Sequence, residues 1–252
     1  MKHELISGRE FNKALFELKE IRVIEFTDKV APKGVELTDL SNDEDGSVVG
    51  WMEDGTYKVS TQNEGQKVIF NEDCKKMFAD FLHLKEIEFC MIDTTHVTDM
   101  SEMFAECIGL ISLDVSNFDT SSVENMGNMF YFYHGESLDL SNFDTSNVTD
   151  MCGMFAWCEN LKNLDLHNFD TSNVTDMASM FWQCIRLKHL DLSSFNVSNV
   201  VTMACMFAGC ENLKEIDLSN FDTSKVNDMS NMFSRCYELT SLDLSNFDTN
   251  FA

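Results

Sequence analysis

The chain has 252 residues, of which 44% are apolar, and its formal net charge is −25. This charge disfavours contact with nucleic acid and with anionic lipid, and it favours basic partners or cations. No stretch approaches the roughly 20 apolar residues that a membrane helix needs, so we do not expect membrane insertion. Because the chain is strongly acidic, we do not expect direct nucleic-acid binding either.

Residues 1–72 lack the periodicity of the rest of the chain and predict an N-terminal α+β capping segment. Ser7 and Glu10 form a capping-box pattern that starts a helix. A strand is expected over residues 21–26 and a hairpin over residues 48–60 around Gly55. Another strand, over residues 68–70, should lead into a helix near Asn71.

The first ten residues contain no apolar signal-peptide core. We therefore expect a cytoplasmic protein, or a cell-surface protein if the chain lacks its export signal.

A unit of 26 residues recurs seven times over residues 73–252, with one residue missing after Met129. A Met-Phe pair marks each copy, with the methionine at positions 77, 103, 129, 154, 180, 206 and 232. A fixed period of this length predicts stacked supersecondary units, that is, a solenoid.

Each unit divides into a predicted strand, a turn and a short helix. In the copy at 161–181, Leu164 and Leu166 alternate with polar residues, so they should point inward from a strand while Asp165 points outward. A polar turn over residues 170–173 follows. A helix should then begin at Asp176 and place Met177, Met180 and Phe181 on its inner face.

Several segments are similar to the BspA-like leucine-rich repeat family, which includes the domain of unknown function abundant in mycoplasma surface lipoproteins. The matching motifs are Leu-Asp-Leu-Ser-Asn-Phe-Asp-Thr-Ser-Asn-Val-Thr-Asp-Met (138–151), Met-Phe-Ala-Gly-Cys-Glu-Asn-Leu (206–213) and parts of residues 45–78. The resemblance implies an α/β leucine-rich-repeat solenoid of seven strand-turn-short helix units. It also implies a binding role, often at a cell surface, and supplies no catalytic residues.

The chain has nine cysteines, and the column that five of them share predicts buried, reduced thiols. Five share one column of the repeat, at Cys107, Cys158, Cys184, Cys210 and Cys236, where other copies carry Phe81 and Tyr133. A position that accepts Phe, Tyr or Cys packs an apolar group. Since no Cys-x-x-Cys occurs, a zinc site is not expected.

One outward strand position is acidic in every copy. The column consists of Glu88, Asp114, Asp139, Asp165, Asp191, Asp217 and Asp243. Stacked at the strand spacing of about 4.8 Å, these carboxylates should raise one another's affinity for protons or cations. They form either a concave acidic stripe that engages a basic partner, or a repeated consensus whose charges serine hydroxyls and solvent relieve.

A second acidic column falls at the turn. It consists of Asp93, Asp119, Asp144, Asp170, Asp222 and Asp248, with Asn196 in the sixth place. Hydrogen bonding to the local backbone is the expected role. Calcium binding is the alternative, although no EF-hand spacing exists.

Aromatic residues break the consensus in three neighbouring copies. Tyr131, Phe132 and Tyr133 stand beside the deletion, and Trp157 and Trp182 follow in the next two copies. They are either anchors of an interface or residues that repack around the deletion. His167 and His189 interrupt polar columns and are interpreted as surface residues rather than metal ligands.

No motif of catalysis, phosphate binding or cofactor binding occurs, so neither enzymatic activity nor a cofactor is expected. The first hypothesis is a non-enzymatic protein-binding scaffold that uses the acidic column and the aromatic residues. The alternative is an intracellular acidic inhibitor, of the phage anti-defence type, that mimics nucleic-acid charge and blocks a basic nucleic-acid-binding protein. The uncovered last unit allows an end-to-end homodimer, a truncation, or a fold-back of Phe251.

Overall fold

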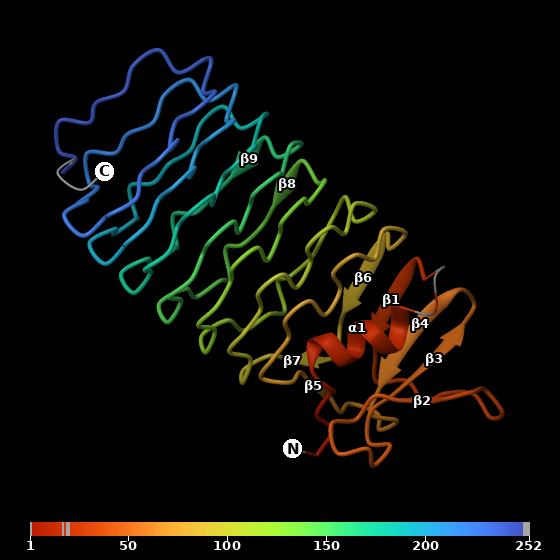
Figure 1. The fold of residues 1–252 in the computed structure, drawn as a ribbon. Coiled ribbons are helices and arrows are strands. Elements are labelled where there is room, and N and C mark those ends of the chain that lie inside the picture. The colour runs from red at the N-terminus through yellow and green to blue at the C-terminus, as the bar shows by residue number, and fades with distance from the viewer. Residues whose placement is uncertain (1, 17, 19–20, 249–252) are drawn as a thin grey trace.

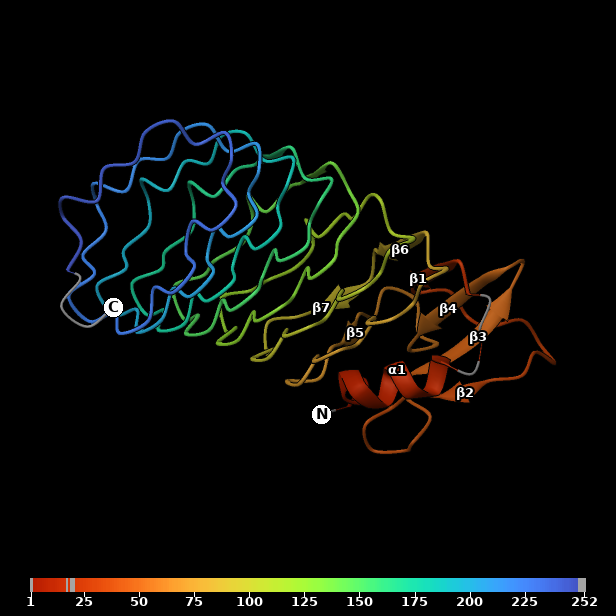
Figure 2. The same ribbon diagram turned by 45° about the horizontal axis from the view of Figure 1, so that its top comes forward.

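The computed structural model describes residues 2–16, 18 and 21–248. Figure 1 shows an N-terminal segment that contains the helix and the longer strands, followed by successive layers of chain that run to the C-terminus. In the turned view of Figure 2 the layers again lie side by side, with the N-terminal segment at one end. The predicted fold-back of Phe251 lies outside the described residues.

Helix α1 (Gly8–Phe16) begins at the predicted capping box. Glu10 Oε2 accepts hydrogen bonds from the Ser7 hydroxyl at 2.8 Å and from the Ser7 backbone N–H at 3.3 Å. Phe11 and Leu15 are fully buried on its inner face. Both bonds are donated by Ser7 to Glu10, and the helix begins where the capping-box pattern predicted it.

A five-stranded sheet in the order β2-β3-β4-β1-β6 forms the body of the N-terminal segment. Its strands are β1 (Val23–Phe26), β2 (Thr38–Asp39), β3 (Val49–Glu53), β4 (Thr56–Ser60) and β6 (Glu86–Phe89). Strands β3 and β4 pair antiparallel around Asp54 and Gly55, whose φ angles are 49° and 82°, which confirms the predicted hairpin. Strand β1 runs parallel to both β4 and β6.

Because β6 comes from the first repeat, the sheet connects the N-terminal segment to the repeats. The division at residues 72 and 73 stays a prediction. The remaining strands form two parallel pairs, β5 (Val68–Ile69) with β7 (Ile92–Asp93) and β8 (Ser137–Leu138) with β9 (Asn163–Leu164). The strand at residues 68–70 is therefore confirmed, whereas a turn and not a helix follows it.

The predicted leucine-rich-repeat solenoid of seven strand-turn-short helix units is wrong. Within the described ranges, α1 is the single helix, and it precedes the repeats. The repeats consist mostly of turns and irregular chain with small sheets. Single parallel bridges join equivalent positions of successive layers, at Asp73, Asp99, Asn125, Asp150, Asp176, Thr202 and Asp228.

The backbone of the Met-Phe run explains why no helix forms there. In the layer that contains Met180, the N–H groups of residues 177, 179, 181 and 183 donate to the carbonyl groups of residues 202, 204, 206 and 208 in the next layer, at 2.8 to 3.1 Å. An α-helix would direct these N–H groups along its own axis. Ser179 and Gln183 instead adopt φ angles of 58° and 61°, which interrupt a right-handed helix.

The core runs through all the layers. One phenylalanine from each layer stacks on the phenylalanine of the next, from Phe78 to Phe233. The ring centroids of successive phenylalanines are 5.5 to 5.8 Å apart. The inward positions of the predicted strand are also correct, because Leu164 and Leu166 are buried while Asp165 is exposed. Buried and exposed side chains therefore alternate along this segment even though few strands form.

Helix α1 covers the carbonyl edge of the first layer. The Gly8 N–H donates to the Asp73 carbonyl at 2.7 Å, and Asn12 Nδ2 donates to the Ala79 carbonyl at 2.8 Å. A Cβ atom on Gly8 would lie 2.5 Å from the Cys74 carbonyl carbon and 2.6 Å from the Lys75 oxygen. Glycine is therefore required here for close approach of two backbones.

We expect Gly8→Ala to lower the free energy of unfolding by about 1–3 kcal/mol, because the added methyl group forces α1 away from the first layer. Urea unfolding followed by circular dichroism measures the change. Arg9→Ala is the matched control, since Arg9 is exposed on the same helix. Equal unfolding midpoints for the wild type and Gly8→Ala would contradict the described contact.

Candidate functional site: an acidic row on the strand face

The predicted acidic column forms a continuous row of exposed carboxylates. All seven predicted members, Glu88, Asp114, Asp139, Asp165, Asp191, Asp217 and Asp243, are exposed. Each aspartate interacts electrostatically with the next one along the row. The structure thus places the residues side by side as the sequence predicted. We call this set, with the addition described below, the acidic row.

The row extends one strand further than the sequence indicated. Strand β1 pairs Glu25 directly with Glu88 of β6 on one side and with Lys58 of β4 on the other. Residues opposite one another in register point to the same face of a sheet, so Glu25 is a further member of the row. The polar position of Glu25 within Val23–Phe26 was a usable signal, but the pairing of β1 with β6 was not predicted.

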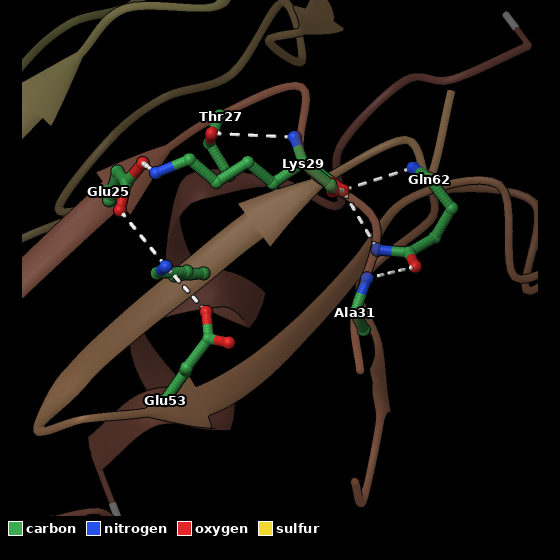
Figure 3. Close-up of polar contacts among 8 residues, drawn as sticks. Glu25, Thr27, Lys29, Ala31, Glu53 and Gln62 are labelled. Atoms are coloured by element: carbon green, nitrogen blue, oxygen red, sulfur yellow. Dashed lines mark hydrogen bonds and ion pairs between the residues drawn. The ribbon is translucent and has the colours of Figure 1, made fainter. Parts of the chain in front are cut away.

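Two lysines form ion pairs with Glu25 at the N-terminal end of the row, and Figure 3 shows Lys29 beside it. Lys58 Nζ lies 3.6 Å from Glu25 Oε2 and 2.5 Å from Glu53 Oε2, and Lys29 Nζ lies 3.0 Å from Glu25 Oε1. Burial acts to raise the pKa of Glu25, but the hydrogen bond from Lys29 and the charge of Lys58 outweigh it, so the pKa is lowered. The hydrogen bond to Glu53 is the largest cause of a raised pKa at Lys58.

Each aspartate of the row is held by the backbone two residues later. The Ser141 N–H donates to Asp139 Oδ1 at 3.0 Å, and the Ser193 N–H donates to Asp191 Oδ1 at 2.9 Å. The same bond occurs at the other row aspartates, 114, 165, 217 and 243, at 2.9 to 3.1 Å. These bonds fix the carboxylates on the chain in one orientation.

The bonds also determine the ionisation of the row. Hydrogen bonds from the backbone and hydroxyl of Ser141 lower the pKa of Asp139, and the charge of Asp165 raises it by less. The pKa values of the other row aspartates are also lowered, chiefly by hydrogen bonds from the residue two positions later. Neighbouring carboxylates do raise one another's pKa, as predicted, but local donors outweigh this repulsion, so the net pKa of each row aspartate is lowered.

Shallow hollows lie between neighbouring carboxylates. One of about 330 Å³ is lined by Asp139, Asp165, His167 and Asn163 among others. Comparable hollows lie between residues 191 and 217 and between residues 217 and 243. Carboxylate and amide oxygens around a shallow depression suit an ammonium or guanidinium group.

The two histidines of the strand face each contact a carboxylate. His167 Nδ1 lies 2.8 Å from Asp165 Oδ1, and His189 Nδ1 lies 3.4 Å from Glu215 Oε1. In the part of the chain that the structure describes, no three His, Cys, Asp or Glu side chains converge as ligands of a metal ion. No helix among those residues is long and apolar enough to cross a membrane.

The second acidic column does bond the local backbone, as the turn pattern predicted. Asp144 Oδ1 accepts from the Ser146 N–H at 3.0 Å, and Asp170 Oδ1 accepts from the Ser172 N–H at 2.9 Å. A third polar column, formed by the bridging positions from Asp73 to Asp228, was not predicted, because Asp176 was expected to begin a helix. Asp176 instead forms a bridge between layers and accepts from the Ala178 N–H at 2.8 Å. Burial raises its pKa.

The cysteine column is buried or half-buried and reduced in the structure. Each thiol donates to a phenylalanine carbonyl, for example Cys158 Sγ to Phe130 O at 3.2 Å. Burial raises the pKa of Cys107 and of Cys158 to about 12. The thiols therefore pack as small apolar groups, as predicted, and are poor nucleophiles.

The predicted aromatic residues separate into two groups. Tyr133 is fully buried and belongs to the core. Tyr131, Phe132, Trp157 and Trp182 are half-buried and contact one another at the surface. We call these four residues the aromatic strip. They lie in the Met-to-Cys run of their layers, outside the strand run that carries the acidic row.

Comparison with known proteins gives one match. The family model described as "Mycoplasma protein of unknown function, DUF285" matches residues 72–181 and residues 157–252. No curated protein matches the chain. No solved structure matches it either.

We expect the acidic row to make stability depend on pH below about pH 4, the usual range of aspartate titration. The row aspartates have lowered pKa values in the folded chain. Their contribution is therefore present above the unfolded pKa and is lost as the pH falls through the folded pKa. The combined variant Asp139→Asn, Asp165→Asn, Asp191→Asn should lose less stability than the wild type on acidification, as measured by urea unfolding at several pH values.

Asp176→Asn supplies a control of opposite sign. The pKa of Asp176 is raised in the folded chain, so its protonation favours folding as the pH falls. Removing that carboxyl should steepen the loss of stability in acid. Parallel pH curves for the wild type and the triple variant would contradict the described hydrogen bonds.

Proposed function

The chain belongs to the family described as Mycoplasma protein of unknown function, DUF285, and we propose that it is a non-enzymatic scaffold that binds a basic protein partner through the acidic row. The narrower likeness to BspA-like repeats, carried by the motif at 138–151, supports a binding role. Such a scaffold would bind its partner in the cytoplasm or at the cell surface.

The observation that carries this proposal is the preorganisation of the row. Its aspartates are exposed, their pKa values are lowered, and each is oriented by a backbone N–H. A partner would meet carboxylates that are already ionised and fixed, so ordering them on binding would cost little entropy. Charges arranged in this way accelerate encounter and favour a complementary surface.

The N-terminal end of the row offers an internal example of the proposed contact. Lys58 bridges Glu25 and Glu53, and its side chain is only 13% exposed. The members from Asp114 onward are bonded to the chain by N–H groups, hydroxyls and one imidazole. We propose that lysine or arginine side chains of the partner occupy the hollows between these members.

A second candidate is the intracellular inhibitor that mimics nucleic-acid charge. The favouring observation is the same line of ionised carboxylates, repeated once in each layer at about the strand spacing of 4.8 Å. Under this proposal the partner is itself a nucleic-acid-binding protein. Both candidates use one surface, and they differ in whether nucleic acid competes with the chain.

We expect the combined variant Asp114→Asn, Asp139→Asn, Asp165→Asn to bind its partner at least about tenfold more weakly, since three charge-assisted contacts are lost. Asparagine can still accept the bond from the backbone N–H. The measurement is quantitative mass spectrometry of proteins retained by the immobilised chain, from cytosolic and from surface fractions. Retention should fall between about 50 mM and about 500 mM salt.

The matched control is Asp119→Asn, Asp144→Asn, Asp170→Asn. It removes the same charge from the same layers, five residues further along the chain. Equal loss of the partner in both variants would mean that net charge and not the row determines binding. Competition by DNA or RNA for the retained protein would favour the nucleic-acid mimic over the general scaffold.

A further inference from the structure

The aromatic strip is a continuous surface of rings across three layers. The ring centroids of Tyr131 and Phe132 are 5.9 Å apart, those of Phe132 and Trp157 are 5.9 Å apart, and those of Trp157 and Trp182 are 5.4 Å apart. His134 extends the strip beyond Phe132, with a centroid distance of 5.3 Å. All these side chains are half-buried, so part of each ring faces solvent.

Two members of the strip occupy a backbone conformation that aromatic residues rarely adopt. Phe132 and Trp157 have φ angles of 63° and 61°. The equivalent residues of the other layers, also at positive φ, are Asp80, Glu106, Gln183, Gly209 and Arg235. A bulky residue in the left-handed region is strained by contacts between its Cβ atom and the backbone. These two aromatics therefore occupy the column against the preference of the backbone.

The other two members replace small buried residues. The column of Tyr131 and Trp182 holds Ala105, Ala156 and Ala208 in neighbouring layers, and these alanines are 1–6% exposed. The core does not require a large side chain at this position. Repacking around the missing residue also fails to explain Trp182, which lies two layers from Tyr131.

The surroundings of the strip are acidic. Glu106 stands one layer before Phe132 in the same column, and its N–H donates to the Tyr131 carbonyl at 2.9 Å. Burial and the charge of Glu106 both raise the pKa of Tyr131. Glu159 follows Trp157 closely, with its N–H bonded to the Trp157 carbonyl at 2.8 Å. Aromatic faces beside carboxylates attract cations and repel anions.

We propose that the aromatic strip is a second binding surface, which takes arginine side chains of a basic peptide segment. Guanidinium groups stack on aromatic faces and bond carboxylates at the same time, which a compact ammonium group does less well. The surface uses residues outside the acidic row and does not depend on the function proposed for the row.

Tryptophan fluorescence isolates this surface. Trp51 is 1% exposed, so Trp157 and Trp182 supply the solvent-sensitive signal. Three short peptides, with arginine, lysine or glutamine alternating with glycine, serve as probes. We expect a change of tryptophan emission that saturates with the arginine peptide, at a lower concentration than with the lysine peptide. The glutamine peptide should give no change.

The decisive variants are Phe132→Asn and Trp157→Gln, because Asn128 and Gln183 already adopt positive φ in this chain. Binding of the arginine peptide should weaken about tenfold in each, while the melting temperature stays equal or rises. For Phe132→Asn the reporter tryptophans remain, and for Trp157→Gln calorimetry measures the binding. Tyr237→Ser removes an exposed aromatic elsewhere and should change neither quantity.

Several outcomes would overturn the proposal. A lower melting temperature in both variants with unchanged binding would make the strip a packing feature. Equal affinity for the glutamine peptide would exclude guanidinium recognition. Loss of the fluorescence change in the variant Asp114→Asn, Asp139→Asn, Asp165→Asn, with the strip intact, would assign the peptide to the acidic row. If only the function proposed for the acidic row is wrong, the arginine peptide should still change the tryptophan emission.

Discussion

The hydrogen bonds between the Met-Phe runs of successive layers are the constraint on which the rest of the molecule depends. Four N–H groups of each run that is followed by another, such as those of residues 151, 153, 155 and 157, donate to the carbonyl groups of the following layer. This is possible because two residues in each layer, here Gly153 and Trp157, adopt positive φ. Each run between two others is then bonded on both edges, and its alternate side chains are free to fill a common core. Stacked phenylalanines and buried methionines are the result, with no helix required.

The direction of these bonds gives the stack two different ends. Carbonyl groups face the N-terminal segment, and N–H groups face the C-terminus. At the first layer α1 supplies donors through the Gly8 N–H and the Asn12 amide, and the glycine allows the two backbones to approach. The sheet contributes a second connection, because β1 pairs with β6 of the first repeat. The row of carboxylates passes across this junction without a break from Glu25 to Glu88.

The sequence predicted what side chains determine and missed what the backbone determines. The alternation of buried and exposed residues around Asp165 follows from the burial of Leu164 and Leu166. It was predicted correctly although few strands form. The helix was predicted from the spacing of Met177, Met180 and Phe181, but a series of turns buries that pattern equally well. The left-handed residues that distinguish the two are Lys, Glu, Ser or Cys as often as Gly or Asn, so they carry no signal. The extension of the row to Glu25 rests on a strand pairing over 60 residues apart in sequence, which local patterns do not determine.

A fold maintained by backbone bonds and a stacked core leaves its outward positions open to change. The column that contains Phe132 and Trp157 illustrates this freedom, since it accepts acids, an amide, glycine, arginine and two aromatics at one backbone conformation. Residues that follow the backbone preference there need no functional explanation, whereas two aromatics that oppose it do. The acidic row is the reverse case, because each aspartate satisfies a local N–H and would be retained for the turn alone. Its charge, not its hydrogen bond, is therefore the property to test, and Asp→Asn separates the two.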